Sequence, residues 1–538
     1  MKPNIIIFNP DEMRADAVGH LGENGACTPF LDEMARTEAV SFRNAFCQNP
    51  VCVPSRCSFT TGLYPHARGH RTMAYLLRQG EESIFSELKK DGYYVWMNAR
   101  NDLVAAQDEK LLESHATEIY YGGRRKKAPG PLPDQKGKSP LDFPAMYGGK
   151  LGLDEQGKNY SRDDEDLDAA IGRIKNKPKN QPLCLFLGLA YPHPPYQVEE
   201  PYFSRIDRTK LKQRIRAEEG SGKAKIEDAI RANQKLQGYT EEQWTELRAT
   251  YLGMTSKVDE QFQKLCNALK EAGEYDNSAI FFFSDHGDFA GDYGLAEKAQ
   301  NTFEDCLTNV PFLIKPPKGY EIDPGISDSL VELVDFYATV MEMAQAQPAH
   351  THYGHSLTGV LKDRKLEIRE FVTCEGGRNP EEIHCDEFHA AGPGGTTPYS
   401  PYYARHLAQT DSEAHAKGYM IRTKEYKYVG RVNGEDEFYD LVGDPQELHN
   451  EINSSRYLEK IREMEKMLRI WLMRTADVVP FDYDKRFSQT MVWEEIKRMV
   501  PPEYAEEFQE KVRSGTNKFL IVAECQRRFG MYWNEDNK

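Results

Sequence analysis

The stretch Cys52-Val53-Pro54-Ser55-Arg56, followed by Thr61-Gly62, is the most informative part of this chain. It comes after an apolar and polar segment, residues 39–46. Pro54-Ser55 is typical of a first helical turn, because the missing N–H of proline costs nothing there. A thiol at this turn lies at the positive end of the helix dipole, beside the fixed charge of Arg56. The stretch therefore predicts a helix start that holds an activated nucleophile or a bound anion.

Three cysteines, Cys47, Cys52 and Cys57, recur at every fifth residue in this region. A metal or disulfide cluster is one interpretation, but zinc sites usually pair cysteines at shorter spacings such as Cys-x2-Cys. We favour ordinary buried cysteine for Cys47 and Cys57. For Cys52, the Pro-Ser-Arg that follows favours a chemical role.

The composition is that of a globular protein. The chain has 538 residues, of which 39% are hydrophobic and 29% charged, so we expect a large domain with a smaller one appended. No run of 18 apolar residues is present to span a membrane. Met1-Lys2-Pro3 leads directly into an apolar strand, which leaves no room for a signal peptide. A cytoplasmic protein is the prediction.

Cysteine content and net charge limit the partners. Ten cysteines without regular pairing agree with a reducing compartment. The net charge of −16 argues against general binding to nucleic acid or to an anionic membrane. An anionic substrate must therefore be attracted by a local cluster of cations.

Apolar runs alternate with helical patterns through the first two thirds of the chain. Between residues 241 and 273, apolar side chains recur at helical spacing, and Gly273 is a suitable C-cap. The alternation predicts an α/β layered fold with ligands at the carboxyl ends of the strands. Four runs are predicted as buried parallel strands: residues 4–8, 93–97, 183–190 and 279–283.

The remaining segments suggest the domain organisation. Residues 122–138 predict an exposed loop, and the basic segment 208–237 a solvated helix or lid, with substrate contact less favoured. Short antiparallel strands and an amphipathic helix follow residue 366, at 420–422, 426–431, 437–441 and 457–474. We predict a catalytic domain over 1–365, an α+β subdomain over 366–480 and a mostly helical extension over 481–538, which is a candidate for subunit contact.

Polar side chains follow the predicted strands. Asp11 and Glu12 come after the first, and Ser-Asp-His-Gly-Asp, residues 284–288, follows the fourth. Helix capping is the usual explanation of such an aspartate, and metal ligation is the alternative. Carboxylates with one imidazole suit Ca²⁺ or Mg²⁺ better than Zn²⁺.

Two further side chains are candidates for chemistry. His193 lies in Tyr-Pro-His-Pro-Pro-Tyr, residues 191–196, where prolines on both sides hold the backbone extended and aim the imidazole. A surface histidine in a proline-rich loop is the alternative. Lys298 lies in a loop, where most lysines are simply solvated.

Together these segments resemble the type I sulfatases of the alkaline-phosphatase-like clan. Cys-x-Pro-Ser-Arg-x4-Thr-Gly is similar to that family's signature, and the other motifs occur in the family's order over residues 4–315. Tyr439-Asp440-Leu441 and Asp444-Pro445 extend the resemblance to about residue 480. It implies a large mixed sheet between helices, plus a smaller C-terminal α+β subdomain with a four-stranded antiparallel sheet.

The resemblance implies a sulfuric ester hydrolase. Its nucleophile would be formylglycine, made from Cys52 by a formylglycine-generating maturase, and its substrate a sulfated saccharide or a small organic or aryl sulfate. A divalent cation, Ca²⁺ with Mg²⁺ or Mn²⁺ as alternatives, would polarise the sulfate oxygens and help to deprotonate the hydrated aldehyde. Its implied ligands are Asp11, Glu12, Cys52, Asp285 and His286, with Glu12 standing where many members have aspartate or glutamine.

The resemblance also implies roles in catalysis. Arg56, Arg100 and Lys298, with the cation, would neutralise the sulfate oxygens. One hydroxyl of the hydrated aldehyde would attack sulfur, and His193 or Lys298 would protonate the departing alcohol. The second hydroxyl would then release sulfate and regenerate the aldehyde.

One stretch departs from the family. After Gly92-Tyr93 the family usually continues to Gly-Lys-Trp-His, whereas this chain has Ala99-Arg100-Asn101-Asp102. Arg100 can replace the lysine as a cation, with a planar fork that suits an oxyanion. Asp102 cannot act as a histidine would, so it is a candidate to orient Arg100 or, like Asn101, to bind the substrate.

Two other functions stay open. Phosphonate monoester hydrolases and phosphodiesterases of the clan share the Cys-x-Pro-Ser-Arg core and the Asp-His metal site. A non-catalytic protein that binds a sulfated ligand is suggested by Arg100 and Asp102, but the intact nucleophile motif argues against it. Residues 388–405, with Tyr399, Tyr402 and Tyr403, are candidates to overhang the pocket and stack on a ring, or to pack on their own domain.

Overall fold

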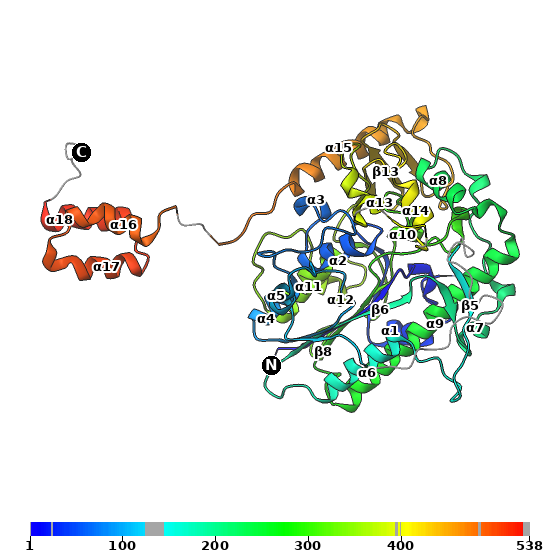
Figure 1. The fold of residues 1–538 in the computed structure, drawn as a ribbon, viewed down its shortest axis with the longest axis horizontal. Helices are drawn as coiled ribbons and strands as arrows, with labels where there is room; N and C mark the ends of the chain where they lie inside the picture. Colours follow the sequence, from blue (N-terminus) through cyan, green and yellow to red (C-terminus); the bar gives the residue numbers. More distant parts are fainter. Residues whose placement is uncertain are drawn as a thin grey trace. The chain divides into compact units, whose positions relative to one another are not determined.

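The computed structural model describes residues 2–22, 25–123, 145–392, 396–398, 400–482 and 486–530 (Figure 1). The chain divides into two compact units, residues 1–479 and 480–538. The predicted loop over 122–138 lies almost entirely outside the described residues, as do Tyr399 and the last residues of the tail. The predicted boundary between residues 365 and 366 falls inside the first unit, and it stays a prediction.

An eight-stranded mixed sheet forms the centre of the first unit, in the order β10-β2-β9-β8-β1-β6-β3-β4. β9 is antiparallel to both of its neighbours, and the other strand pairs are parallel. The strands are β1 (Asn4–Asp11), β2 (Val40–Phe46), β3 (Tyr94–Asn98), β4 (Glu118–Tyr120), β6 (Leu183–Pro192), β8 (Ser278–Phe283), β9 (Phe312–Lys315) and β10 (Gly325–Glu332). The four predicted strands are confirmed as β1, β3, β6 and β8, and their carboxyl ends lie along one edge of the sheet.

Helices cover both faces of this sheet (Figure 1). Ile6 and Phe8 of β1 face one apolar layer and Ile5 and Ile7 the other, as the alternation of a strand requires. The first layer lies under α1 (Pro29–Thr37), α6 (Arg162–Lys175) and the predicted long helix α9 (Glu241–Glu271); the second lies under α2 (Cys52–Thr61), α4 (Ile84–Lys90) and α11 (Val334–Ala344). Burial on both faces explains why the strands are continuous apolar runs in the sequence.

The predicted four-stranded antiparallel sheet is confirmed. It consists of β11 (Val372–Gly376), β12 (Gly418–Arg422), β13 (Tyr426–Arg431) and β14 (Glu437–Asp440) in that order. The amphipathic helix α15 (Leu458–Thr475) packs its apolar side, including Met464 and Trp471, against Ile421, Tyr428 and Phe438 of this sheet. β11 had no distinct signal in the sequence.

The basic segment 208–237 is only partly solvated. Within it, α8 (Lys225–Asn233) buries Ile226 and Ile230 and packs against α14 (Tyr403–Ala408). Short 3₁₀ turns make up much of the rest of the segment. This part of the chain therefore packs against α14, which carries Arg405 toward the site described below.

In its described residues, the second unit is mostly helical. α16 (Gln489–Ile496), α17 (Ala505–Arg513) and α18 (Lys518–Phe529) enclose a small core that includes Ile496, Phe508 and Ile521. Across the described ranges, every helix is too short or too polar to cross a membrane.

Candidate active site

The signature stretch forms the start of α2, directly after β2. Val51 is the N-cap in an extended conformation, and Cys52 is the first helical residue. Gly62 ends the helix with a φ of 69°, the left-handed conformation that glycine adopts most easily. The predicted helix start is therefore confirmed, and it presents the Cys52 side chain from the first turn. Cys47 and Cys57 are buried in the apolar layer, as expected for ordinary core cysteines.

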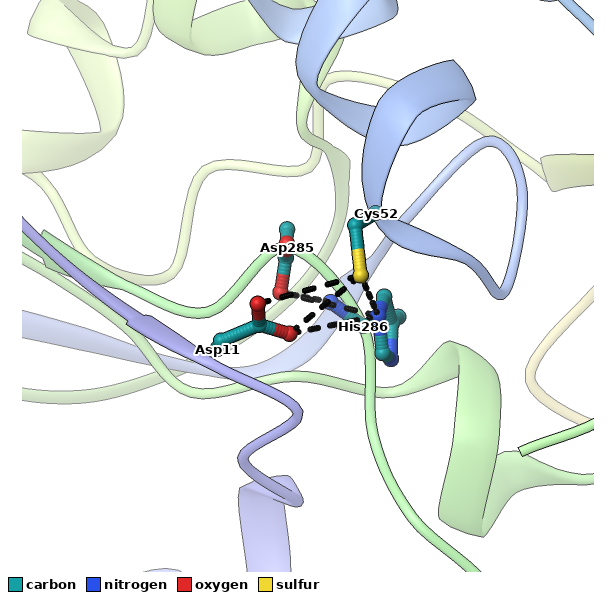
Figure 2. Close-up of side chains that lie close together, drawn as sticks. All are labelled: Asp11, Cys52, Asp285 and His286. Atoms are coloured by element: carbon teal, nitrogen blue, oxygen red, sulfur yellow. Dashed lines mark hydrogen bonds and ion pairs between the residues drawn. The ribbon is translucent and has the colours of Figure 1, made fainter. Parts of the chain in front are cut away.

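Four buried side chains meet at the carboxyl edge of the sheet: Asp11, Cys52, Asp285 and His286 (Figure 2). One ligand atom from each lies within 4.8 Å of the others. Cys52 Sγ is 3.2 Å from His286 Nε2 and 3.4 Å from Asp11 Oδ1. Asp11 ends β1, and Asp285 and His286 follow β8, so the parallel strands bring these residues together.

The chemistry of this group fits a divalent cation. His286 Nδ1 donates to the Gly287 carbonyl at 2.9 Å, so Nε2 carries the lone pair that faces Cys52. Burial lowers the pKa of His286, which keeps the imidazole neutral as a ligand must be. Two carboxylates with one neutral imidazole are a ligand set for Ca²⁺, Mg²⁺ or Mn²⁺.

The buried Arg56 side chain binds the carboxylates of Asp11 and Asp285. Its Nε lies 2.8 Å from Asp285 Oδ2, and its Nη2 lies 3.1 Å from Asp11 Oδ2. Its Nη1 points toward the backbone carbonyls of Arg100 and Asn101, at 3.5 and 3.4 Å. The side chain is 1% exposed, and these hydrogen bonds all stay inside the protein. The geometry makes Arg56 the charge that balances both carboxylates.

Arg100 approaches Asp11 from the more open side. Its Nη2 pairs with Asp11, its Nε donates to the Leu189 carbonyl at 3.3 Å, and 35% of its side chain is exposed. Burial alone would raise the pKa of Asp11, but Arg100 and Arg56 hold that pKa well below its ordinary value. Arg100 thus pairs with a site carboxylate while part of its surface stays accessible.

The two residues that follow Arg100 differ in what their side chains contact. Asn101 Oδ1 accepts hydrogen bonds from the backbone N–H groups of Leu103 and Val104 at 3.0 and 3.2 Å, so this side chain shapes the turn. Asp102 has a φ of 47° and a side chain that is 36% exposed, with Oδ2 4.0 Å from Arg56 Nη1. A substrate-binding role stays a prediction for both residues. Of the two side chains, the Asp102 carboxylate is the more accessible.

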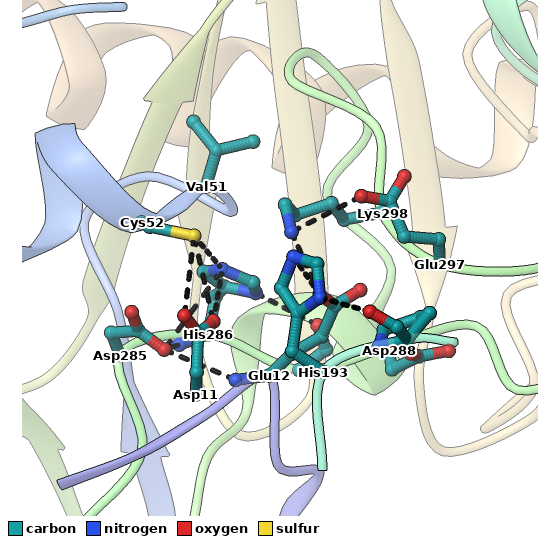
Figure 3. A network of polar contacts seen from close by, with 12 residues as sticks. Asp11, Glu12, Val51, Cys52, His193, Asp285, His286, Asp288, Glu297 and Lys298 are labelled. Carbon is teal, nitrogen blue, oxygen red and sulfur yellow. Dashed lines mark hydrogen bonds and ion pairs between the residues drawn. The ribbon is translucent and has the colours of Figure 1, made fainter. Parts of the chain in front are cut away.

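Glu12, His193 and Lys298 form a second cluster beside the first (Figure 3). Glu12 Oε2 lies 2.7 Å from Lys298 Nζ and 3.4 Å from His193 Nε2. Asp11, Glu12 and His193 also have ligand atoms within 4.8 Å of one another, whereas Glu12 is absent from the group around Cys52. Its role as a metal ligand stays a prediction, because its carboxylate is shared with Lys298 and His193.

His193 and Lys298 differ in their protonation state. His193 Nδ1 lies 2.7 Å from the Pro194 carbonyl, and burial, reinforced by Lys298, lowers the pKa of His193 to about 3. Burial alone would lower the pKa of Lys298, but neighbouring Cys52 and Glu12 raise it well above its ordinary value. Within this pair, Lys298 carries the proton at neutral pH.

Comparison with protein families matches residues 3–346 to the sulfatase family, the greater part of the chain. The chain belongs to the sulfatase family. It is therefore a sulfuric ester hydrolase by family, and formylglycine and a divalent cation are general features of that family. The resemblance seen in the sequence is confirmed.

Known sulfatases match most of the chain. An arylsulfatase from Clostridium perfringens is 25% identical over 499 residues, covering 87% of this chain and 94% of that protein. An N-acetylglucosamine-6-O-sulfatase from Bacteroides thetaiotaomicron is 24% identical over 535 residues, covering 87% and 86%. The phosphonate monoester hydrolase of Agrobacterium radiobacter shares the fold, with a TM-score of 0.66 at 19% identity over 88% of this chain and 96% of that one.

Residues from the C-terminal half of this sulfatase also reach the site. The ring of Tyr402 meets the ring of His193 edge-on, with centroids 6.2 Å apart, whereas Tyr403 lies 6.1 Å from Phe388 of its own segment. Arg405 pairs with Glu297, the residue before Lys298. Neither Glu297 nor Arg405 was identified as a site residue from the sequence. Glu297 could have been found from its position next to Lys298, whereas no local pattern marks Arg405.

Proposed function

We propose that this sulfatase hydrolyses a sulfate ester through formylglycine at position 52, made from Cys52 by a maturase, with a divalent cation beside it. The observation that carries the proposal is the buried group of Asp11, Asp285 and His286 around Cys52, at the first turn of α2. A helix N-terminus and a cation both favour an anionic group at this point. Converted to formylglycine, position 52 would supply a hydrated aldehyde as nucleophile, and the cation would polarise the sulfate oxygens.

The residues around this group have different roles in the proposed reaction. Arg56 balances the charge of Asp11 and Asp285 and holds both carboxylates in place as ligands. Arg100 and Lys298 bring positive charge to the sulfate oxygens, and removing one such group typically lowers the rate by about 10²–10³-fold. Lys298, protonated beside neutral His193, donates a proton to the departing alcohol, and His193 orients the sulfate.

The proposed substrate is a sulfated saccharide or a small organic or aryl sulfate. The matched relatives include an arylsulfatase and an N-acetylglucosamine-6-O-sulfatase. Tyr402, half-buried beside His193, offers an aromatic edge to a sugar or aryl ring. Asp102 offers an accessible carboxylate to a substrate hydroxyl or amine.

The substrate preference can be tested with matched leaving groups. With protein produced beside a maturase, we expect kcat/KM for 4-nitrophenyl sulfate to exceed the values for a 4-nitrophenyl phosphodiester and phosphonate monoester by more than about tenfold, a difference of about 1.4 kcal/mol. The reverse order would establish the alternative, a phosphonate monoester hydrolase, a class of enzyme that shares this fold. Binding of a sulfated ligand without turnover would support a non-catalytic protein.

Removal of the cation should affect both activity and stability. We expect chelation with EDTA to abolish hydrolysis and lower the melting temperature, since an ion at 100 times its Kd stabilises the fold by about 2.7 kcal/mol. Activity and thermal unfolding would be measured after adding back Ca²⁺, Mg²⁺ or Mn²⁺. Asp285→Asn is the control, because its melting temperature should not respond to the ions. Full activity in protein shown by elemental analysis to be free of metal would contradict the cation site.

A further inference from the structure

Lys298 lies between two buried carboxylates. Its Nζ is 2.7 Å from Glu12 Oε2 and 3.2 Å from Glu297 Oε1. Figure 3 shows the Lys298 side chain with both glutamates. Both glutamates are fully buried. An ammonium that has to neutralise both carboxylates is drawn toward Glu297 and away from the sulfate. The position of Lys298 therefore depends on whether Glu297 has another cationic partner.

Arg405 is that partner. Its Nη1 lies 2.7 and 2.6 Å from the two carboxylate oxygens of Glu297, and its Nη2 lies 3.0 Å from Glu387 Oε1. The side chain is 4% exposed. Among the described residues, Arg405 and Lys298 are the lysines and arginines within 4.0 Å of the Glu297 carboxylate. Arg405 thus carries most of the pairing with Glu297.

The backbone around Glu297 is also fixed. Glu297 has a φ of 65°, which residues other than glycine seldom adopt, and its N–H donates to the Tyr196 hydroxyl at 2.7 Å. The Arg405 guanidinium carbon lies 5.2 Å from the centre of the Tyr402 ring, which in turn meets His193. The segment that contains Tyr402 and Arg405 is therefore in contact with the surroundings of both Lys298 and His193.

We propose that Arg405 is a positioning residue for catalysis: by pairing with Glu297 it leaves the Lys298 ammonium directed at Glu12 and at the leaving oxygen of the sulfate ester. This inference rests on the proposed function, in which Lys298 acts at the sulfate. Arg405 itself contacts no reacting atom. Its effect is on where the Lys298 proton is delivered.

A double-mutant cycle tests the inference. In Arg405→Gln, the buried Glu297 charge has only Lys298 as partner, and we expect kcat to fall by about 10²-fold with a smaller change in KM, because a displacement of about 1 Å at the site has that effect. In the double variant Glu297→Gln/Arg405→Gln, the Glu297 charge no longer competes with Glu12 for Lys298, so kcat should recover to within severalfold of the wild type. Equal losses in the single and double variants would overturn the proposal.

The leaving group provides a readout that a merely structural role would not change. Across aryl sulfates whose phenols differ in pKa, Arg405→Gln should show a larger loss for the more basic phenols, as should Lys298→Ala, because these need protonation most. Arg422→Gln is the matched control: it loses a buried arginine that pairs with Asp305 at 2.7 Å, without contact to the site. It should lose stability and keep the wild-type dependence on the leaving group.

The outcomes separate this inference from the proposed function. A wild-type enzyme without sulfatase activity would remove the proposed function itself. An active wild type, an impaired Lys298→Ala and an unaffected Arg405→Gln would overturn only the role of Arg405. Should Arg405→Gln fail to fold, the double variant, which leaves no unpaired carboxylate at Glu297, and Arg405→Lys, which keeps the charge but loses the fork, carry the test. Both variants leave Lys298 without competition from Glu297, so the wild-type leaving-group dependence is expected, and the dependence of Lys298→Ala in either of them would contradict the proposal.

Discussion

Cys52→Ala is expected to lower kcat for a sulfate ester by about 10⁴–10⁶-fold, as loss of a nucleophile does in other hydrolases. Alanine cannot be converted to formylglycine, and it removes one of the four side chains that meet at the carboxyl edge of the sheet. The other three, Asp11, Asp285 and His286, would still hold a cation. Activity should fall to background while ion-dependent stabilisation is largely kept.

The measurement pairs kinetics with the mass of the tryptic peptide that ends at Arg56. Protein made beside a formylglycine-generating maturase should show the mass decrease of the cysteine-to-formylglycine conversion. Cys57→Ala is a matched control, because Cys57 is buried on the same helix, where its thiol lies in the apolar layer, 3.9 Å from the Leu103 carbonyl. It should lose some stability and keep its activity. Full activity with an unmodified Cys52 would contradict the formylglycine mechanism and favour a thiol-based one.

The second large effect is expected for Arg56→Gln. Without Arg56, Asp285 loses its arginine partner and Asp11 keeps only Arg100, although both carboxylates are fully buried. Breaking a buried pair in this way typically destabilises a protein by about 3–5 kcal/mol. Displacing these two carboxylates, the proposed ligands of the cation, should lower the rate by a further ~10²-fold. Denaturant unfolding without added metal and kcat/KM with metal would measure the two effects separately.

Arg100→Gln is the comparison for Arg56→Gln. Arg100 pairs with Asp11 but is partly exposed, so its loss should affect the rate with less effect on the free energy of unfolding. An Arg56→Gln variant that unfolds like the wild type and loses only activity would contradict a role for Arg56 in holding the two buried carboxylates. Arg56 would then act mainly on the substrate.

Much of the fold could be predicted from local pattern. The runs that became β1, β3, β6 and β8 are buried on both faces, so each is continuously apolar over a strand's length. β9 could not be predicted, because its four residues, Phe312–Lys315, carry no periodic signal and its antiparallel direction is set by its neighbours β2 and β8. Long-range pairing of this kind depends on topology and not on composition.

The candidate site divides in the same way. The sequence by itself determined the helix start at Cys52 and the polar side chains after strands, Asp11, Asp285 and His286, because capping, strand length and turn chemistry are local. Only the tertiary structure decided that Glu12 faces Lys298 and His193, that Asn101 shapes a turn, and that Arg405 pairs with Glu297 across 108 residues of chain. The physical reason is that a buried charge must find its partner in space, and the partner's place in the chain leaves no local pattern.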